Sequence, residues 1–445
     1  MTARKSSGIM IVTGPTATGL HRGLGRVDVV ALTVNNIVGA GIFTMPAALA
    51  ASAGDWSVAT LLLTFALVSL MALCTVEVAS RYESTGGPVI YASAAFGPAA
   101  GFFVGWLMYL SRLSAFGAIA AVMLDYGSGV WPALGGTGVR TLAITVFIST
   151  LAAINLRGVV RGARTSNILT TFKMVPLVLL AFAGAWLAGQ TSVPLPPPHG
   201  FSELGGAVLI AFFACMGFEQ AAVVAGEVRD PRRDLPVGIL GGVAVIGALY
   251  TLVMYACVRT VPDLAHSSRP LADSAAVIAG RPGATLVALT AVLSCAGSLS
   301  GWMIVSPRVL YALGEQGDFP RAFARVNPIY HTPSVAIVTS AFVVWLLTVS
   351  GTFVYLATFS AMARLLMYAS ICAALITLRR QDGPAPITIP LGPLWSVVVL
   401  LSSVLVLGTT TVNAVRDMLI AIGLGWALRT AVKHRNKNDQ QVVVD

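Results

Sequence analysis

Long apolar segments recur along nearly the whole chain, and no other feature of the sequence restricts the fold so strongly. A membrane-spanning helix needs about 20 consecutive apolar residues, and polar breaks divide this sequence into runs of roughly that length. The runs are too long for membrane β-strands and lack their alternation of polar and apolar residues. The sequence therefore predicts an all-α membrane protein with twelve transmembrane helices, at 27–52, 57–80, 96–126, 138–155, 165–188, 203–227, 236–260, 284–312, 334–350, 353–378, 393–410 and 413–430.

Charged residues make up only 10% of the 445 residues, against about a quarter in soluble proteins. The net charge is nevertheless +10, from 28 Lys and Arg and 18 Asp and Glu. With the N-terminus placed in the cytoplasm, 20 of the 28 cations fall on the inner side, three lie within the membrane and five lie outside. Since cytoplasmic loops carry the excess of Lys and Arg, this predicts a plasma-membrane protein with both termini cytoplasmic. The surplus charge then reflects insertion into the lipid bilayer and indicates no nucleic-acid partner.

Two predicted spans are interrupted by glycine at corresponding places. The first span contains Gly39 and Gly41, and the sixth contains Gly217, which follows Gly41 by 176 residues. A second pair of similar segments has nearly the same separation in sequence. Short segments that begin at Pro88 and Pro270, 182 residues apart, precede the third and eighth spans. A single glycine in a membrane helix is often a packing site. Two matched pairs favour an internal repeat.

The matched pairs predict two units of five spans each. Because five is odd, the second unit enters the membrane from the opposite side, which is the 5+5 inverted repeat of many secondary transporters, with discontinuous helices 1 and 6. The expected organisation is a cytoplasmic N-terminal tail, a first repeat unit, a second repeat unit, two appended C-terminal helices and a cytoplasmic C-terminal tail. Their boundaries are 1–26, 27–188, 203–378, 393–430 and 431–445.

Three stretches of the sequence carry a family resemblance. The first is Gly39-Ala40-Gly41-Ile42-Phe43 with Pro46, the second runs from Gly217-Phe218-Glu219 to Pro236, and the third runs from Arg308 through Asp318-Phe319-Pro320 to Pro333. In these stretches the chain resembles the amino acid–polyamine–organocation (APC) superfamily, and within it an amino acid permease. The resemblance implies the LeuT-type inverted-repeat fold and transport of amino acids or related amines.

A broken helix offers partners for both charged groups of an α-amino acid. In the first break, which runs from Ile37 through Val38 to Gly41, the N–H groups of Gly39, Ala40 and Gly41 can hold a carboxylate at the positive end of the following half-helix. Carbonyl oxygens can accept from the ammonium group. The resemblance implies these roles, with the carbonyl acceptors at Ile37, Phe213, Ala214 and Met216.

Two aromatic residues and one carboxylate complete the site that the resemblance implies. Phe213 and Trp302 match family positions where an aromatic side chain closes over the substrate, and core packing is the alternative for each. Glu219 directly follows the sixth-span break. A carboxylate inside a membrane is costly and is usually functional, and the resemblance implies proton sensing or gating. The alternative is a structural pair with a nearby arginine.

Lys173 lies inside the fifth span, whereas the other three lysines lie in the tails. In proton-coupled members of the family, a lysine here occupies the place of a sodium ion and can bridge the first and eighth spans. Burial favours the neutral form of a lysine, so its protonation could couple to conformation. The alternative is a permanently charged structural cation, as in exchangers that need no ion gradient.

Arg112 in the third span and Arg364 in the tenth are less expected. When the third span is aligned with that of an arginine/agmatine antiporter, Ser111 and Arg112 fall beside the ligand. The antiporter has an uncharged residue at the position of Arg112. Two arginines near the cavity would repel a cationic side chain and could attract an additional carboxylate. They therefore favour a neutral or acidic amino acid as substrate. The alternative is that one or both pair with Glu219 or with helix carbonyls.

Together these features predict a transporter that works by alternating access, with proton-coupled symport as the leading mode. Exchange of one amino compound for another is the second mode, and a sensor or channel that reuses the fold is a third possibility. All five histidines fall outside the spans, so a haem ligand pair or metal centre within the membrane is not expected. The sequence therefore indicates neither an enzyme nor a cofactor. The predicted small-molecule partners are an amino acid and protons.

Overall fold

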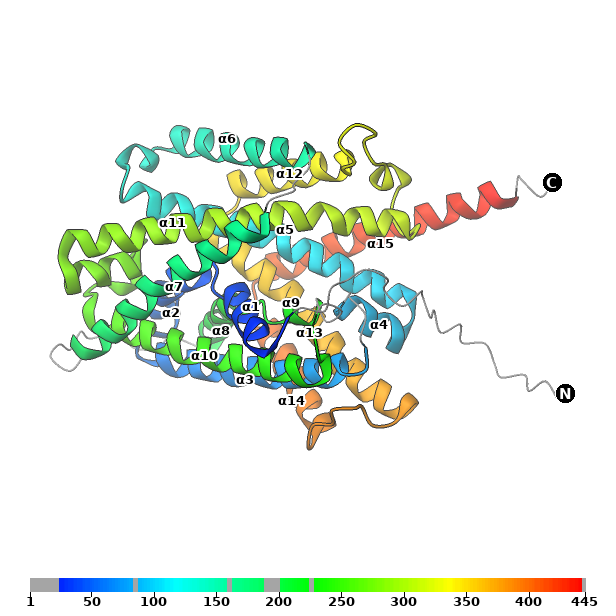
Figure 1. Cartoon of the computed structure of the whole chain (residues 1–445), viewed down its shortest axis with the longest axis horizontal. Coiled ribbons are helices and arrows are strands. Elements are labelled where there is room, and N and C mark those ends of the chain that lie inside the picture. The colour runs from blue at the N-terminus through cyan, green and yellow to red at the C-terminus, as the bar shows by residue number, and fades with distance from the viewer. Residues whose placement is uncertain (1–23, 83–86, 158–161, 188–200, 224–227, 442–445) are drawn as a thin grey trace.

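The computed structural model describes residues 24–82, 87–157, 162–187, 201–223 and 228–441 (Figure 1). In these ranges the chain is helical apart from turns and a parallel bridge between Leu24 and Val228. Side chains of residues 162–172, 201–202 and 436–441 are outside the description. The α-helices are α1 (Arg26–Ile37), α2 (Gly41–Ala53), α3 (Ser57–Ala79), α4 (Pro88–Phe96), α5 (Pro98–Ser128), α6 (Thr137–Leu156), α7 (Gly162–Leu187), α8 (Phe201–Cys215), α9 (Glu219–Val223), α10 (Pro231–Thr260), α11 (Pro270–Glu315), α12 (Ser334–Ser350), α13 (Phe353–Asp382), α14 (Gly392–Gly408) and α15 (Val412–Gln441).

The two interrupted helices lie where the glycines predict them. The chain leaves helical geometry between the end of α1 and the start of α2, and again between α8 and α9. In the second gap Gly217 has φ of +127°, a conformation that residues with a side chain rarely adopt. Glycine therefore permits the sharp change of direction there.

The second pair of similar segments also appears in the helices. α4 begins at Pro88 and ends before Gly97, which has φ of +91°. The first part of α11 begins at Pro270 and is interrupted at Ala279 and Gly280, where Gly280 has φ of +65°. In both places a short proline-initiated helix turns at a glycine with positive φ and continues into a long helix.

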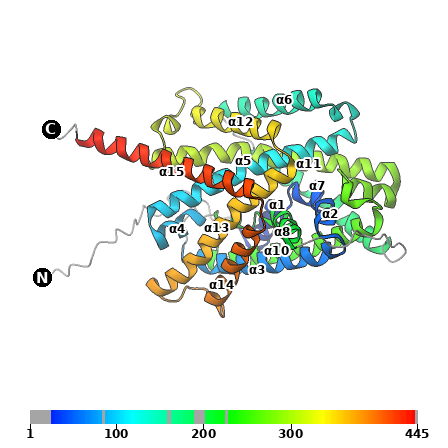
Figure 2. The same ribbon diagram turned by 180° about the vertical axis from the view of Figure 1, so that it is seen from behind.

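The broken helices α1, α2, α8 and α9 lie in the middle of the molecule (Figure 1). α2 packs on α8, and α5 packs on both α11 and α13. Seen from behind, α13, α14 and α15 cover the other side (Figure 2). Of the most apolar stretch of each helix, 89% is buried in α5 but only 22% in α6. α5 is therefore an inner wall, whereas α6 and the adjacent α12 form one side of the bundle.

Exposed side chains on the outer helices are strongly apolar. Leu142 on α6, Phe342 on α12 and Leu401 on α14 are each at least 60% exposed. Large exposed apolar surfaces are unusual for soluble proteins, and the lipid bilayer accommodates them. Together with the long apolar helices, these surfaces identify an integral membrane protein.

Each of the twelve predicted apolar runs contains helix within the described residues, but not every one of these helices is long and apolar enough to cross a membrane. In the described ranges, six helices are long and apolar enough to cross a membrane, or seven if α14 and α15, bent by 116°, are one span. Interruption is one reason, because α1 and α8 have 12 and 15 residues and about 20 are needed. α15 continues to Gln441, beyond the expected boundary at 430. Nearly all of the predicted N-terminal tail lies outside the described residues.

Candidate functional site

The two helix breaks lie directly against each other. A Cβ atom added to Gly41 would lie 2.5 Å from the Cα of Ala214, and one added to Gly217 would collide with the carbonyl of Asn36. Glycine therefore allows backbone-to-backbone approach at both points. Gly39 differs, because its Cβ would meet only the nearby Ile37 carbonyl oxygen, at 3.9 Å. A methyl group at position 39 would therefore meet little of the surrounding structure.

Lys173 on α7 extends into the first break. Its Nζ donates to the carbonyl oxygens of Val38 at 2.6 Å and Asn35 at 3.1 Å. Only 6% of the residue is exposed. Carbonyl groups at the end of a helix lack partners within it, and the lysine supplies two donors to such groups. Lys173 thus connects the fifth predicted span to the first, and the predicted bridge to the eighth span stays a prediction.

The carbonyl of Ile37 already accepts two hydrogen bonds. Its donors are the N–H of Gly39 at 2.8 Å and the hydroxyl of Tyr250, on α10, at 3.2 Å. A carbonyl oxygen has two lone pairs, so a substrate ammonium would have to replace one donor. The role predicted for Ile37 stays a prediction.

Gly41 is the first residue of α2, so its N–H has no acceptor within that helix.

Glu219 begins α9 and is 1% exposed. Its Oε1 accepts from Nη1 of Arg364 at 3.0 Å and from Nε2 of Gln220 at 3.3 Å. Its Oε2 accepts from the N–H of Gly217 at 3.1 Å and from the hydroxyl of Tyr368. The carboxylate is thus paired and hydrogen-bonded, as a buried charge requires. It connects the second break to α13.

Arg364 extends this network to two further helices. Its Nε donates to the hydroxyl of Ser111 on α5 at 2.9 Å, and Ser111 in turn contacts Ser360 on α13. The guanidinium also lies 5.8 Å from the ring centroid of Trp302 on α11, within cation–π range. The pairing with Glu219 is the alternative that the sequence left open for Arg364.

Arg112 follows Ser111 on α5 and is also buried. Its Nη2 donates to Oε1 of Gln220 at 3.2 Å, the neighbour of Glu219 in the chain. In the described part of the protein it forms no ion pair. The predicted residues Ser111, Arg112, Glu219, Trp302 and Arg364 are therefore brought into one cluster.

Phe213, Ala214 and Met216 are all buried around the end of α8. The ring of Phe213 lies edge-on to Phe353 at the start of α13, with 6.0 Å between the ring centroids. This contact fits the core-packing alternative for Phe213. Closure over a substrate stays a prediction for Phe213 and for Trp302.

Three residues that hydrogen-bond to predicted site residues are not identified by the sequence: Tyr368 and Gln220, which contact Glu219, and Tyr250, which contacts Ile37. Tyr368 lies four residues after Arg364, one helical turn away and on the same face, which is a signal that could have identified it. Gln220 adjoins Glu219 in the chain. Tyr250 is far from its partner Ile37 in sequence, and nothing in its local pattern indicates the contact.

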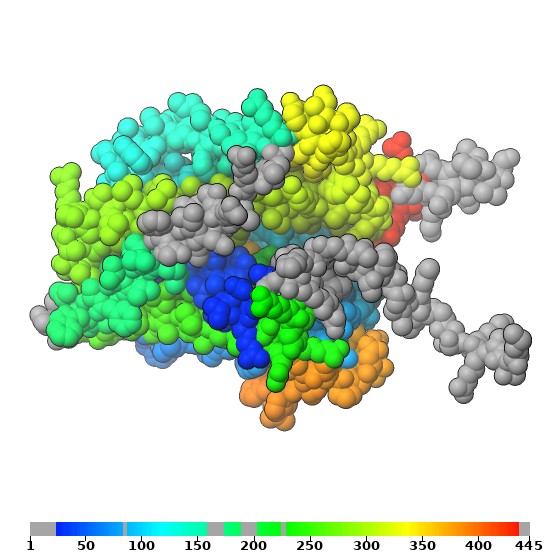
Figure 3. All heavy atoms as spheres, in the orientation of Figure 1, coloured from blue at the N-terminus to red at the C-terminus, as the bar shows by residue number. Residues whose placement is uncertain are grey.

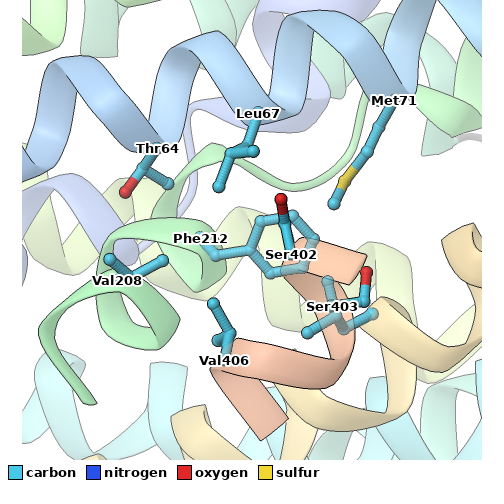
Figure 4. A pocket seen from close by; sticks show the side chains of 9 residues that line it. Thr64, Leu67, Met71, Val208, Phe212, Ser402, Ser403 and Val406 are labelled. Atoms are coloured by element: carbon cyan, nitrogen blue, oxygen red, sulfur yellow. The ribbon is translucent and has the colours of Figure 1, made fainter. Parts of the chain in front are cut away.

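A small recess lies beside this cluster, between α3, α8, α13 and α14 (Figure 4). No residue predicted for the site lines it. Phe212 is shared between the two regions, because its ring also lies edge-on to Tyr368 at 5.9 Å. The lining is apolar side chains and hydroxyl groups, from Thr64, Leu67, Met71, Val208, Phe212, Leu365, Ser402, Ser403 and Val406.

Comparison with known proteins gives consistent results over most of the chain. The family model for amino acid permeases matches residues 24–427. The serine/threonine exchanger SteT of Bacillus subtilis is 25% identical, over 92% of this chain and 95% of the exchanger. An uncharacterised transporter of Mycobacterium tuberculosis is 29% identical over 86% of each chain. The chloroplastic cationic amino acid transporter 9 of Arabidopsis thaliana is 27% identical, over 71% of this chain and 59% of the relative. The chain belongs to the amino acid permease family.

Proposed function

We propose that the protein is a secondary active transporter that moves a neutral or acidic amino acid across the plasma membrane by alternating access, in symport with protons. The observation that carries this proposal is the contact between the two helix breaks, at Gly217 against Asn36 and Gly41 against Ala214. Interrupted helices inside a membrane are tolerated where they line a cavity or bind a ligand. In secondary transporters they form the substrate site.

The proposed architecture is twelve spans arranged as a 5+5 inverted repeat, with two appended helices and both termini in the cytoplasm. The paired breaks support it. So do the two short helices that begin at Pro88 and Pro270 and turn at Gly97 and Gly280. The distribution of Lys and Arg supports the orientation.

The substrate is proposed to bind at the two breaks, beside the points where they touch. Its carboxylate would meet the N–H groups at the start of α2, where the helix dipole is positive, beside Gly39. Its ammonium group would meet backbone carbonyls of the two breaks. Trp302 and the Arg364 network form the adjacent wall.

Alternating access requires one group of helices to move against another. α1 and α3 both pack on α10, and α2 and α3 both pack on α8, which is consistent with a moving bundle of the first, second, sixth and seventh spans. Figure 3 shows α1, in dark blue, beside the green start of α10, and Arg26 pairs with Asp234 there at 2.7 Å. α7 contacts both α10 of this bundle and α11 outside it.

Lys173 is the proposed proton-coupling residue. It sits on α7, between the two groups of helices, and binds the first break. Glu219 is less suited to coupling in this conformation, because it already has Arg364, Tyr368 and Gly217 as partners. Protonating it would leave the buried charge of Arg364 uncompensated, which is costly.

Amino acid exchange is the second candidate mode. The similarity to a serine/threonine exchanger supports it. The same site would serve both modes, and Lys173 would then act as a fixed cation that holds the first break. A sensor or channel would need the same fold but would not accumulate substrate.

Transport by the purified full-length protein in liposomes tests the proposal. Labelled amino acids would be supplied one at a time, with and without an inward proton gradient. Accumulation only with the gradient supports symport, and counterflow without a gradient supports exchange. Absence of uptake, counterflow and thermal stabilisation with all twenty amino acids would refute amino acid transport, since a bound ligand stabilises the state it binds.

A further inference from the structure

Arg112 is a deeply buried cation with unused hydrogen-bond donors. It is 7% exposed, and its one hydrogen bond in the described ranges runs from Nη2 to Gln220. A guanidinium has five N–H donors, so its Nε and Nη1 donate to no protein acceptor there. Arg364 differs, because its Nε, its Nη1 and the face of its guanidinium are all occupied by partners.

The charges in this cluster do not balance. Arg112 and Arg364 bring two positive charges, and Glu219 brings one negative charge that pairs with Arg364. The remaining side chains in contact with these three are neutral: Ser111, Gln220, Trp302 and Tyr368. One buried positive charge is left without a counter-ion in the described part of the chain, and such a charge is costly inside a membrane.

The unpaired guanidinium lies close to the second break. Gln220, its partner, adjoins Glu219, and Glu219 accepts from the N–H of Gly217 in the break itself. A substrate held at the breaks by its α-carboxylate and ammonium groups would direct its side chain toward one of the neighbouring helices. α5, which carries Arg112, contacts α2 after the first break, and Arg112 itself contacts Gln220 on α9 after the second break, so α5 lies beside both breaks.

We infer that Arg112 binds the side-chain carboxylate of the substrate, and that the protein therefore selects dicarboxylic amino acids over neutral and basic ones. The planar fork of the guanidinium matches a carboxylate through two parallel hydrogen bonds, and the incoming charge supplies the missing counter-ion. This inference rests on the proposed function and narrows its substrate class.

Glutamate and glutamine provide the test, because they have nearly the same shape and differ in the charge of the side chain. Their inhibition constants against labelled substrate would be measured on the full-length protein in liposomes at pH 7, with aspartate and asparagine as a second pair. The wild type is expected to bind glutamate about 10- to 100-fold tighter than glutamine, the range for charge-assisted hydrogen bonds.

Two variants and a control test whether the preference for glutamate over glutamine depends on the side chain of Arg112. Arg112→Gln should bring the glutamate-to-glutamine ratio close to one while glutamine is still bound. Arg112→Lys keeps the charge but loses the fork, so an intermediate ratio is expected. Arg416→Gln, on α15 with 61% of the side chain exposed, should leave the ratio unchanged.

A wild type that binds glutamine as tightly as glutamate would overturn the inference, as would an Arg112→Gln variant with the full preference. Uptake of neutral amino acids in either case would leave the proposed function intact. A protein that binds no amino acid at all would overturn both. If Arg112→Gln does not fold, the wild-type ratio alone decides.

Discussion

The Nζ atom of Lys173 lies 2.6 Å from the carbonyl oxygen of Val38, so a cation carried by α7 occupies the break between α1 and α2. The same amine also reaches Asn35. An ammonium donates stronger hydrogen bonds than a neutral amine. Gain or loss of one proton at Lys173 would therefore change how firmly the first break is held against α7. If the proposed proton coupling holds, this contact is the physical route from proton binding to helix movement.

Gly217→Ala is expected to abolish transport. The added methyl group would collide with the Asn36 carbonyl, and alanine does not tolerate φ of +127°. Strain and overpacking each cost about 1–3 kcal/mol. The expected result is loss of amino acid uptake in liposomes, together with a lower midpoint of thermal unfolding.

Gly423→Ala is the matched control for that experiment. Gly423 lies within α15, and a Cβ there would meet no atom within 4 Å. Alanine favours a helix over glycine by about 1 kcal/mol, so stability and uptake should be kept or slightly increased. Normal uptake by Gly217→Ala would contradict the role of the second break.

Glu219→Gln is expected to destabilise the protein more than the joint replacement of Glu219 and Arg364. The single change leaves Arg364 buried without its carboxylate, and breaking a buried pair from one side costs about 3–5 kcal/mol. The double variant Glu219→Gln with Arg364→Met removes the orphaned charge. Thermal unfolding of the two single variants and the double variant measures this, and additive losses would mean that the two residues do not interact.

Tyr126→Phe tests a contact near the start of α2. The hydroxyl of Tyr126, on α5, donates to the carbonyl of Phe43 at 2.7 Å and accepts from the N–H of Leu271 at 3.2 Å. Its loss leaves the buried N–H of Leu271 without this acceptor, at a cost of about 1–3 kcal/mol. The midpoint of thermal unfolding should fall, whereas Tyr255→Phe, at an exposed position, should leave it within experimental error. Equal midpoints for the two variants would show that the Tyr126 hydroxyl contributes nothing.

The helix breaks and the pair of short helices at Pro88 and Pro270 could be predicted from sequence, because they depend on the properties of neighbouring residues. Gly39, Gly41 and Gly217 interrupt apolar runs, and Pro88 and Pro270 are good first residues for a helix. The family was also accessible, because its motifs are short and contiguous. Amino acid permease membership is confirmed over residues 24–427.

The partners of the buried charges could not be predicted in the same way. Glu219 and Arg364 are 145 residues apart, and the sequence shows only that each is a costly charge in need of a partner. It left pairing and substrate binding as alternatives, and side-chain packing decides which contacts form. Lys173 was easier to interpret because it is the one lysine within a predicted span. The donors that saturate the Ile37 carbonyl depend on how α10 packs on α1, which no local pattern encodes.

Lys173→Ala in liposomes with an inward proton gradient tests proton coupling, the central claim, most directly. The wild type should accumulate labelled amino acid above its external concentration, and so should Lys433→Ala, changed at a half-exposed side chain on α15. Lys173→Ala should lose this accumulation while it still performs counterflow, which shows that the variant is folded and binds substrate. Full gradient-driven accumulation by Lys173→Ala would contradict the account.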